Sequence, residues 1–237
     1  MRSLILSGVL LGSSLGFALE VYVSPKYFLW EEFDSSGNKL LDETGLILGL
    51  GLRGDAGFFT GEAELYGGTV RYDGQTQAGD PVETDTNYLG VSAAGGVWGE
   101  AGSTVRLRGE LLYRSELWVR DIESTSKAVG YSETWFFDSI DLGLRLSSGG
   151  TYAYGKYRYM FRDARMQASL TGVPELSPKK GQAYELGAGL KGSSYGIELS
   201  YSYVKFRRSE PKPYGSGYVL QPESVRQIIS LKFISLF

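Results

Sequence analysis

The chain has 237 residues, no Cys and no His, and a formal net charge of −3 at pH 7. The missing Cys excludes disulfides and thiolate chemistry, and the missing His removes the most common general base near neutral pH and the most common metal ligand. The small net charge gives no reason to expect nucleic acid or another strongly charged partner.

The first predicted element is an export signal. Met1 and Arg2 form a short charged start, residues 4–15 are largely apolar, and Ala18 is a small residue where a signal peptidase cleaves. The apolar stretch is shorter than the ~20 residues that a membrane-spanning helix needs. We therefore expect residues 1–18 to be a cleaved signal peptide and residues 19–237 to form one domain.

Segments with alternating apolar and polar residues follow. In residues 104–120, one face carries Val105, Leu107 and Leu111, whereas the other carries charged residues such as Arg108. The 17 Tyr and 33 Gly, against 7 Pro, also favour strands and turns. The pattern predicts ten strands, at residues 19–30, 44–53, 58–72, 86–98, 104–120, 131–146, 151–162, 182–191, 195–206 and 224–237.

The gaps between these strands alternate in length. Gaps after even strands are tight, such as residues 54–57 and 147–150, whereas gaps after odd strands are longer, such as residues 163–181 and 207–223. Alternating short turns and long loops are typical of an antiparallel up-and-down barrel with an even number of strands. We expect an all-β transmembrane barrel of about ten strands, with eight or twelve as alternatives.

The last strand ends the chain on Phe237, with Phe233 and Leu231 on the same face. A strand that runs to a terminal aromatic resembles the closing strand of bacterial outer-membrane β-barrels of the Gram-negative type. The resemblance implies that Phe237, Phe233 and Leu231 belong to the signal read by the barrel-insertion machinery. The family favours an aromatic at the third position from the end, where this chain has Ser235. The resemblance also implies an outer-membrane location with both termini periplasmic, and contact with outer-membrane lipids.

Alternation alone fits either a soluble barrel with an apolar interior or a membrane barrel with a polar one. Residues 195–206 favour the membrane barrel, because Tyr195 and the pair Tyr201 and Tyr203 flank Ile197 and Leu199 on one face. The charged residues of opposite phase then face the lumen. The expected lumen-lining residues are Glu62, Glu64, Arg106, Arg108, Glu110, Arg114, Glu116, Asp141, Arg145, Lys156, Arg158, Glu185 and Glu198.

The motifs that suggest nucleotide binding, calcium binding or catalysis are each incomplete in this sequence. Two G-x-G-x-x-G matches, at residues 49–54 and 187–192, are each followed by a turn and a strand, whereas a dinucleotide site needs a helix there. Residues 34–45 do not match a calcium loop, because Lys39 stands where the loop needs Gly and Gly45 stands where it needs Glu. Catalytic outer-membrane barrels, including the ten-stranded omptins, use a His that this chain lacks. We expect no catalytic residues, no cofactor and no metal site.

Two functions remain open. Ten strands lie just above the size at which side chains fill a barrel, and charges of both signs line the expected lumen. The preferred function is a narrow porin-like conduit for small polar or ionic solutes. The alternative is a surface interaction, adhesion or envelope-stabilising barrel with a sealed lumen. We expect a monomer whose rim contacts lipopolysaccharide phosphates through Arg165, Lys179, Lys180, Arg207, Arg208 and Lys212.

Overall fold

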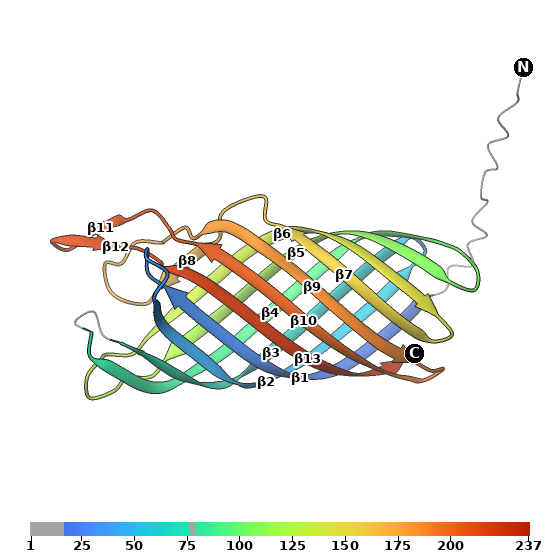
Figure 1. The fold of residues 1–237 in the computed structure, drawn as a ribbon, viewed down its shortest axis with the longest axis horizontal. Helices are drawn as coiled ribbons and strands as arrows, with labels where there is room; N and C mark the ends of the chain where they lie inside the picture. Colours follow the sequence, from blue (N-terminus) through green and yellow to red (C-terminus); the bar gives the residue numbers. More distant parts are fainter. Residues whose placement is uncertain (1–16, 76–78) are drawn as a thin grey trace, which may run out of the picture.

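A computed structural model describes residues 17–75 and 79–237 (Figure 1). Ten long strands form one antiparallel sheet, and pairing of β5 with β6 closes it into a barrel. Their bounds are β1 (Phe17–Phe33), β2 (Lys39–Ala56), β3 (Phe59–Gln75), β4 (Pro81–Ala101), β5 (Arg106–Ile122), β6 (Tyr131–Ser148), β7 (Thr151–Tyr159), β9 (Lys179–Lys191), β10 (Tyr195–Arg207) and β13 (Glu223–Leu236).

Each long strand pairs with its neighbours in chain order, and β1 pairs with β13. The backbone N–H of Phe237 donates to the carbonyl of Leu19 at 2.9 Å, and the reciprocal bond is 3.3 Å. The predicted all-β, up-and-down, ten-stranded barrel is thus confirmed, and the alternatives of eight and twelve strands are wrong.

The two ends of the barrel differ, as the alternating gaps predicted. One end, here the short-turn end, carries residues 57–58, 102–105, 149–150 and 192–194 together with Phe237. The other, the long-loop end, carries residues 34–38, 79–80, 123–130, 160–178 and 208–222. The hairpin of β11 (Lys212–Tyr214) and β12 (Gly217–Val219) projects from the long-loop end (Figure 1).

The strands reach further into the long-loop end than the alternation pattern predicted. Asp42 and Glu43, expected in a loop, lie in β2 and pair with Asp73 and Tyr72 of β3. The largest irregularity follows β7, whose pairing with β9 stops at Tyr157 opposite Tyr184. Beyond it, the short strand β8 (Arg165–Ala168) continues beside β6. The predicted strand at residues 151–162 therefore ends early.

The predicted signal peptide falls mostly on residues 1–16, which lie outside the described residues. The described part of β1 begins at Phe17, and Phe17 and Ala18 pair with Ala56 and Asp55 of β2. Within residues 17–75 and 79–237, no helix is long and apolar enough to cross a membrane.

Three glycines of the two G-x-G-x-x-G matches, Gly51, Gly187 and Gly189, make room for tyrosine rings inside the barrel. A Cβ atom added to Gly51 would lie 2.3 Å from the ring of Tyr22. At Gly187 and Gly189, the same atom would lie 2.4 and 2.5 Å from ring atoms of Tyr154 and Tyr152. A strand glycine commonly marks such a close approach. These glycines therefore have a packing role on inward-facing strand positions, and no nucleotide-binding loop forms.

Candidate functional site: the barrel lumen and its outer wall

The residues that line the lumen change from mostly charged to mostly aromatic along the barrel axis. Along β1, the inward residues run from Tyr22, Ser24 and Lys26 near the short-turn end to Phe28 and Trp30 further along, and all five are buried. Along β5, the inward residues likewise change from charged side chains to Trp118, beyond which Arg120 lies. The short-turn half therefore holds a network of ion pairs, and the long-loop half holds an apolar cluster.

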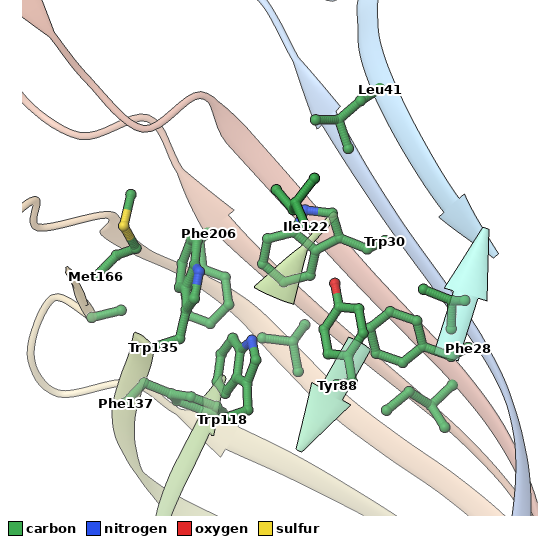
Figure 2. Close-up of a cluster of buried hydrophobic side chains, with 14 of the residues drawn as sticks. Phe28, Trp30, Leu41, Tyr88, Trp118, Ile122, Trp135, Phe137, Met166 and Phe206 are labelled. Carbon is green, nitrogen blue, oxygen red and sulfur yellow. The ribbon is translucent and has the colours of Figure 1, made fainter. Parts of the chain in front are cut away.

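The apolar cluster, here the aromatic plug, consists of Trp30, Trp118, Trp135, Phe137 and Phe206, from β1, β5, β6 and β10 (Figure 2). None of these five side chains is more than 2 % exposed. Trp118 and Trp135 stack with ring centroids 5.5 Å apart, and Trp30 meets Trp135 edge-on at 5.1 Å. Such contacts add to the large apolar area that each ring buries.

Further apolar residues extend the plug toward the long-loop end. Hairpin β3–β4 contributes Val70 and Val82, and the connection after β7 contributes Met166 and Leu176. On the opposite side of Trp30 along β1, nearer the short-turn end, the ring of Phe28 packs beside that of Tyr88, with centroids 4.5 Å apart. Side chains from the wall and from one long connection thus fill this half of the lumen, where a wide vestibule would otherwise lie.

Arg120 lies beside the plug among three carboxylates. Its Nη1 atom is 2.9 Å from both Glu32 and Glu133, and its Nε atom is 3.0 Å from Glu43. The indole N–H groups of the plug hold two of these acids, because Trp30 donates to Glu32 and Trp135 to Glu133, both at 2.9 Å. Among the described residues, no group of three or more acidic side chains is arranged to hold a metal ion.

One ion pair crosses the lumen at the base of the plug. Arg226 of β13 donates two bonds to Glu116 of β5, at 2.6 and 3.0 Å, and its guanidinium lies 4.7 Å from the ring centre of Trp118. Tyr66 donates a third bond to Glu116, at 2.8 Å. These strands are not neighbours in the sheet, so the bonds tie opposite walls together.

Below this pair, charged side chains continue in layers toward the short-turn end. Arg114 donates to Asp141 at 2.7 Å and to Ser92 at 2.8 Å, and Lys232 donates to Glu198 at 2.8 Å. A buried charge is tolerated only when it is paired and hydrogen-bonded, so this pairing is what permits the polar interior. Other pairs are Lys26 with Glu64, Arg53 with Glu20, Arg158 with Glu185, and Arg108 with Asp55 and Glu110.

The structure places most of the residues predicted for the lumen inside this network. Arg106 differs: its side chain is 53 % exposed at the short-turn rim, 3.4 Å from Glu100. Arg145 is inside, with its guanidinium 3.8 Å from the ring centre of Tyr152. The others inside are Glu62, Glu64, Arg108, Glu110, Arg114, Glu116, Asp141, Lys156, Arg158, Glu185 and Glu198.

The predicted set missed several partners that complete the network. Lys26, Arg226 and Lys232 were not assigned to the lumen, although each alternates in phase with buried polar neighbours such as Ser24 and Ser230. Arg53 and Arg120 were also missed. The available signal was the alternation in β1, β2, β5 and β13, where all five residues lie on the face opposite the exposed leucines and aromatics.

The outer wall carries an apolar band between two aromatic levels. Toward the long-loop end, Tyr27 and Tyr201 flank Ile229 in register, and Tyr113 and Tyr159 flank Ile140. Toward the short-turn end, the exposed aromatics are Phe58, Phe59, Tyr195, Phe233 and Phe237. Exposed leucines of β2, β6 and β9 lie between the two levels. This arrangement is typical of a transmembrane barrel, in which aromatic girdles border an apolar band.

The residues predicted to form the insertion signal lie on this wall. Phe237 and Phe233 are exposed, and Leu231 is half-buried on the same face.

The six basic residues predicted to contact lipopolysaccharide lie near the long-loop end in two settings. Arg165, Lys180, Arg207 and Arg208 are exposed, and Arg207 donates to the carbonyl of Lys180 at 2.9 Å. Lys179 and Lys212 are half-buried: Lys179 lies 3.4 Å from Asp163, and Lys212 donates to the carbonyl of Glu175 at 2.6 Å. The guanidinium of Arg165 also covers the ring of Phe136 at 4.5 Å.

Comparisons with known proteins support the architecture. No protein-family model matches the chain, and no curated protein matches its sequence. Among solved structures, the outer membrane protease OmpT from Escherichia coli matches with a TM-score of 0.54 and 10 % identity, over 93 % of this chain and 96 % of that one. An outer-membrane channel from Pseudomonas putida F1 matches over 95 % and 97 % of the two chains, with a TM-score of 0.44 and 11 % identity.

Neisserial surface protein A matches over 92 % of this chain and 96 % of that one, with a TM-score of 0.39 and 10 % identity. The structural neighbours are thus outer-membrane β-barrels of the Gram-negative type. At these identities, the likeness concerns the fold.

Proposed function

We propose that this chain is a monomeric outer-membrane barrel with a sealed lumen that works through its surface, as an interaction or envelope-stabilising protein. The observation that carries the proposal is the aromatic plug. Trp30, Trp118 and Trp135 are each 0 % exposed, and their rings contact one another across the long-loop half of the lumen. A solute path through this half requires that these side chains separate.

The outer surface supports a role outside the lumen. Near the long-loop end, β3 and β4 present Asp73, Glu83 and Asp85 to solvent. Arg207 and Arg208 are exposed at the long-loop end of β10. The β11–β12 hairpin extends this surface away from the barrel (Figure 1). Charges of opposite sign on different parts of the rim suit recognition of a polar partner.

A cell-envelope experiment tests the proposal. In a strain that lacks the gene, wild-type protein should restore resistance to detergent and chelator. A variant in which a two-residue turn replaces the segment 212–219 should fold but restore less resistance. A matched variant with Arg106→Gln, at the opposite end, should restore it fully. Full rescue by the shortened variant would count against a role for this hairpin.

A second candidate function, the narrow conduit, draws support from the polar half of the lumen. Cavities of about 50 and 10 Å³ lie among its charged side chains. If these cavities belong to a conducting path, charge reversal at Arg108 should change ion selectivity, and reversal at the exposed Arg106 should have a smaller effect. Planar-bilayer recordings of the two variants distinguish this function from the sealed barrel.

We also propose that the barrel is non-enzymatic and carries no cofactor. The likeness to an outer-membrane protease concerns the fold alone. The sequence contains no His for the acid–base roles that this side chain most often fills. The buried carboxylates in the lumen are engaged by Arg, Lys and Tyr partners, as with Glu116 and Glu198.

Lipopolysaccharide is the proposed partner of the exposed basic residues on the outer wall. Arg165, Lys180 and Arg207 lie above the long-loop aromatic level, where the phosphates of lipid A would lie if the long-loop end faces outward. Charge-assisted bonds from such side chains hold phosphate groups. Replacement of all three by Gln should lower the amount of lipopolysaccharide that copurifies with the barrel, as measured by phosphate analysis. Arg106→Gln is the control, because Arg106 lies exposed at the short-turn rim.

A further inference from the structure

We propose that Arg145 forms a binding site for one oxyanion, a carboxylate or phosphate group of a small solute, at the short-turn mouth of the lumen. Arg145 lies near the end of β6 at Ser148, and its guanidinium covers the buried ring of Tyr152 at 3.8 Å from the ring centre. Within residues 17–75 and 79–237, no hydrogen bond or ion pair joins this guanidinium to another group. A charged donor without a partner marks a place where a ligand of opposite charge gains hydrogen bonds.

Solvent reaches this end of the lumen. The nitrogens of Arg145 are not among the fully buried polar atoms that lack a partner in the described residues. At the same mouth, the side chains of Arg53 and Glu20 are each 16 % exposed, and that of Lys191 is 15 % exposed. The aromatic plug fills the long-loop half of the lumen, so a solute comes to Arg145 from the short-turn end.

Positive charge exceeds negative charge at this mouth, because every nearby carboxylate already has a cationic partner other than Arg145. The pairs are Glu20 with Arg53 and Lys191, Asp55 and Glu110 with Arg108, and Glu198 with Lys232. With Arg145 included, five cations face four carboxylates. Further from the mouth, the ion pairs match one cation to one carboxylate, so they leave this excess unchanged.

The pairing of β5 with β6 places two arginines side by side, because Arg108 lies directly opposite Arg145. Like charges in directly opposite positions on adjacent strands are destabilising. The charge of Arg108 is offset by Asp55 at 2.6 Å and Glu110 at 2.7 Å, whereas that of Arg145 has no such partner. A third cation, Lys191, lies 5.3 Å from the centre of the Tyr152 ring that Arg145 covers. A bound anion beside Arg145 would offset this repulsion.

The geometry of Arg145 favours an oxyanion over a halide. A guanidinium with one flat face against a ring still presents N–H groups along its edge, in a fixed fork that matches two oxygens of a carboxylate or phosphate. The adjacent cavity, which Arg53, Glu110 and Lys156 also line, has a volume of about 10 Å³. This space holds about one water, so the bound group stays at the mouth and does not pass deeper into the lumen.

An NMR titration of the unaltered barrel tests the site directly. The protein is labelled with nitrogen-15 and refolded in an uncharged detergent, and sodium acetate, sodium phosphate or sodium chloride is added at constant pH and equal ionic strength. The side-chain Nε–H signal of Arg145, identified by its absence from the spectrum of Arg145→Gln, should shift and saturate with acetate, with phosphate or with both. The absence of a saturable shift with either oxyanion, or the same shift with chloride, would overturn the proposal.

Urea unfolding in lipid vesicles assigns the binding to this side chain. At an oxyanion concentration of 100 times Kd, the ratio of folded to unfolded wild-type protein should rise about 100-fold relative to chloride at equal ionic strength. Arg145→Gln should lose this rise and, in chloride, should be at least as stable as wild type, because it removes the charge opposite Arg108. Arg106→Gln is the matched control, since it removes a charge at the same end from a residue 3.4 Å from Glu100, and it should keep the rise. A wild-type response in Arg145→Gln, or an equal loss in both variants, would overturn the assignment.

Discussion

Glu116 and Arg226 join opposite walls of the barrel through two hydrogen bonds of 2.6 and 3.0 Å, directly beneath the ring of Trp118. Both side chains are almost fully buried. Their strands are separated by four others on one side of the sheet, β4, β3, β2 and β1. The pair therefore forms the boundary between the ionic network and the aromatic plug, and it limits how far the two walls move apart.

Removing one member of this pair should be much more costly than removing both. Glu116→Leu leaves a buried Arg226 without its acid, and we expect a loss of about 3–5 kcal/mol in the free energy of unfolding. The double variant Glu116→Leu with Arg226→Met should lose less than the sum of the single losses, because no uncompensated charge remains. Urea unfolding in phospholipid vesicles measures all four proteins. Additive losses would show that the two residues do not act as a pair.

The orientation of the wall predicts an asymmetric response to charge along β6. Leu144 is exposed midway along the apolar band, whereas Thr134 is exposed beyond Tyr113 and Ile140 on the long-loop side. Leu144→Arg should lower the free energy of unfolding of the barrel in vesicles by about 2–4 kcal/mol, and Thr134→Arg should lower it by about 0–1 kcal/mol. Equal costs at the two positions would contradict the proposed membrane level.

The contact between Gly51 and Tyr22 predicts a site that does not accept even one methyl group. A Cβ atom at Gly51 would lie 2.3 Å from the Tyr22 ring, which is buried and has little room to move. Gly51→Ala should lower the free energy of unfolding by about 1–3 kcal/mol through overpacking. Gly95→Ala is the matched control in β4, because nothing lies within 4 Å of its added Cβ. The same urea measurement should find this control close to wild type, and a neutral Gly51→Ala would contradict the packing.

The first long-loop connection predicts a titration that can be measured in solution. Hydrogen bonds from the Asn38 side chain and from the backbone N–H groups of Asn38 and Ser36 lower the pKa of Asp34 below its ordinary value of 3.8. Since the folded pKa is lowered, the stabilisation by this turn is present above the unfolded pKa and is lost as pH falls through the folded pKa. NMR titration of the Asp34 carboxyl should show the lowered value, and Asn38→Ala should raise it. An unchanged pKa in Asn38→Ala would contradict this role of the side chain.

Alternation along each strand was sufficient to predict the closed barrel. Residues 104–120 were predicted as one strand with a charged face, and β5 spans Arg106–Ile122 with Arg114, Glu116 and Arg120 buried. Successive side chains of a strand point to opposite faces, so the pattern specifies the direction of each residue from local sequence alone. The same reasoning placed Asp141 and Glu198 on inward-facing positions.

The aromatic plug was not predicted, because alternation does not specify at which level along the barrel axis a side chain lies. Trp118 lies in phase with Glu116 and Arg120, and Trp135 lies in phase with Glu133. Whether these indoles meet depends on the register of β5 against β6 and on the stagger of all ten strands around the barrel. Trp118 pairs directly with Trp135 in this register, and Trp30 reaches them from β1 on another part of the wall. Such levels are properties of the closed sheet.

The irregular segments could not be predicted from local sequence patterns, because they too depend on the closed barrel. The strand β8 is only four residues long, and it pairs with β6 because the connection after β7 packs Met166 and Leu176 against the plug. The pairing of Met166 with Leu176 depends on this packing as much as on the sequence of either residue. The β11–β12 hairpin, with Gly215 at φ 58°, is similarly short and falls in the long loop predicted at residues 207–223.

Single-channel recording in planar bilayers tests the central claim, the sealed lumen, most directly. Wild-type barrel that is shown to be folded by heat-modifiable gel mobility should give no steady current steps. The variant with Trp30→Ala, Trp118→Ala and Trp135→Ala, if it folds, should give salt-dependent steps, because it removes the rings that close the long-loop half. Steady, salt-dependent conductance from the wild-type barrel would contradict the account and favour the conduit.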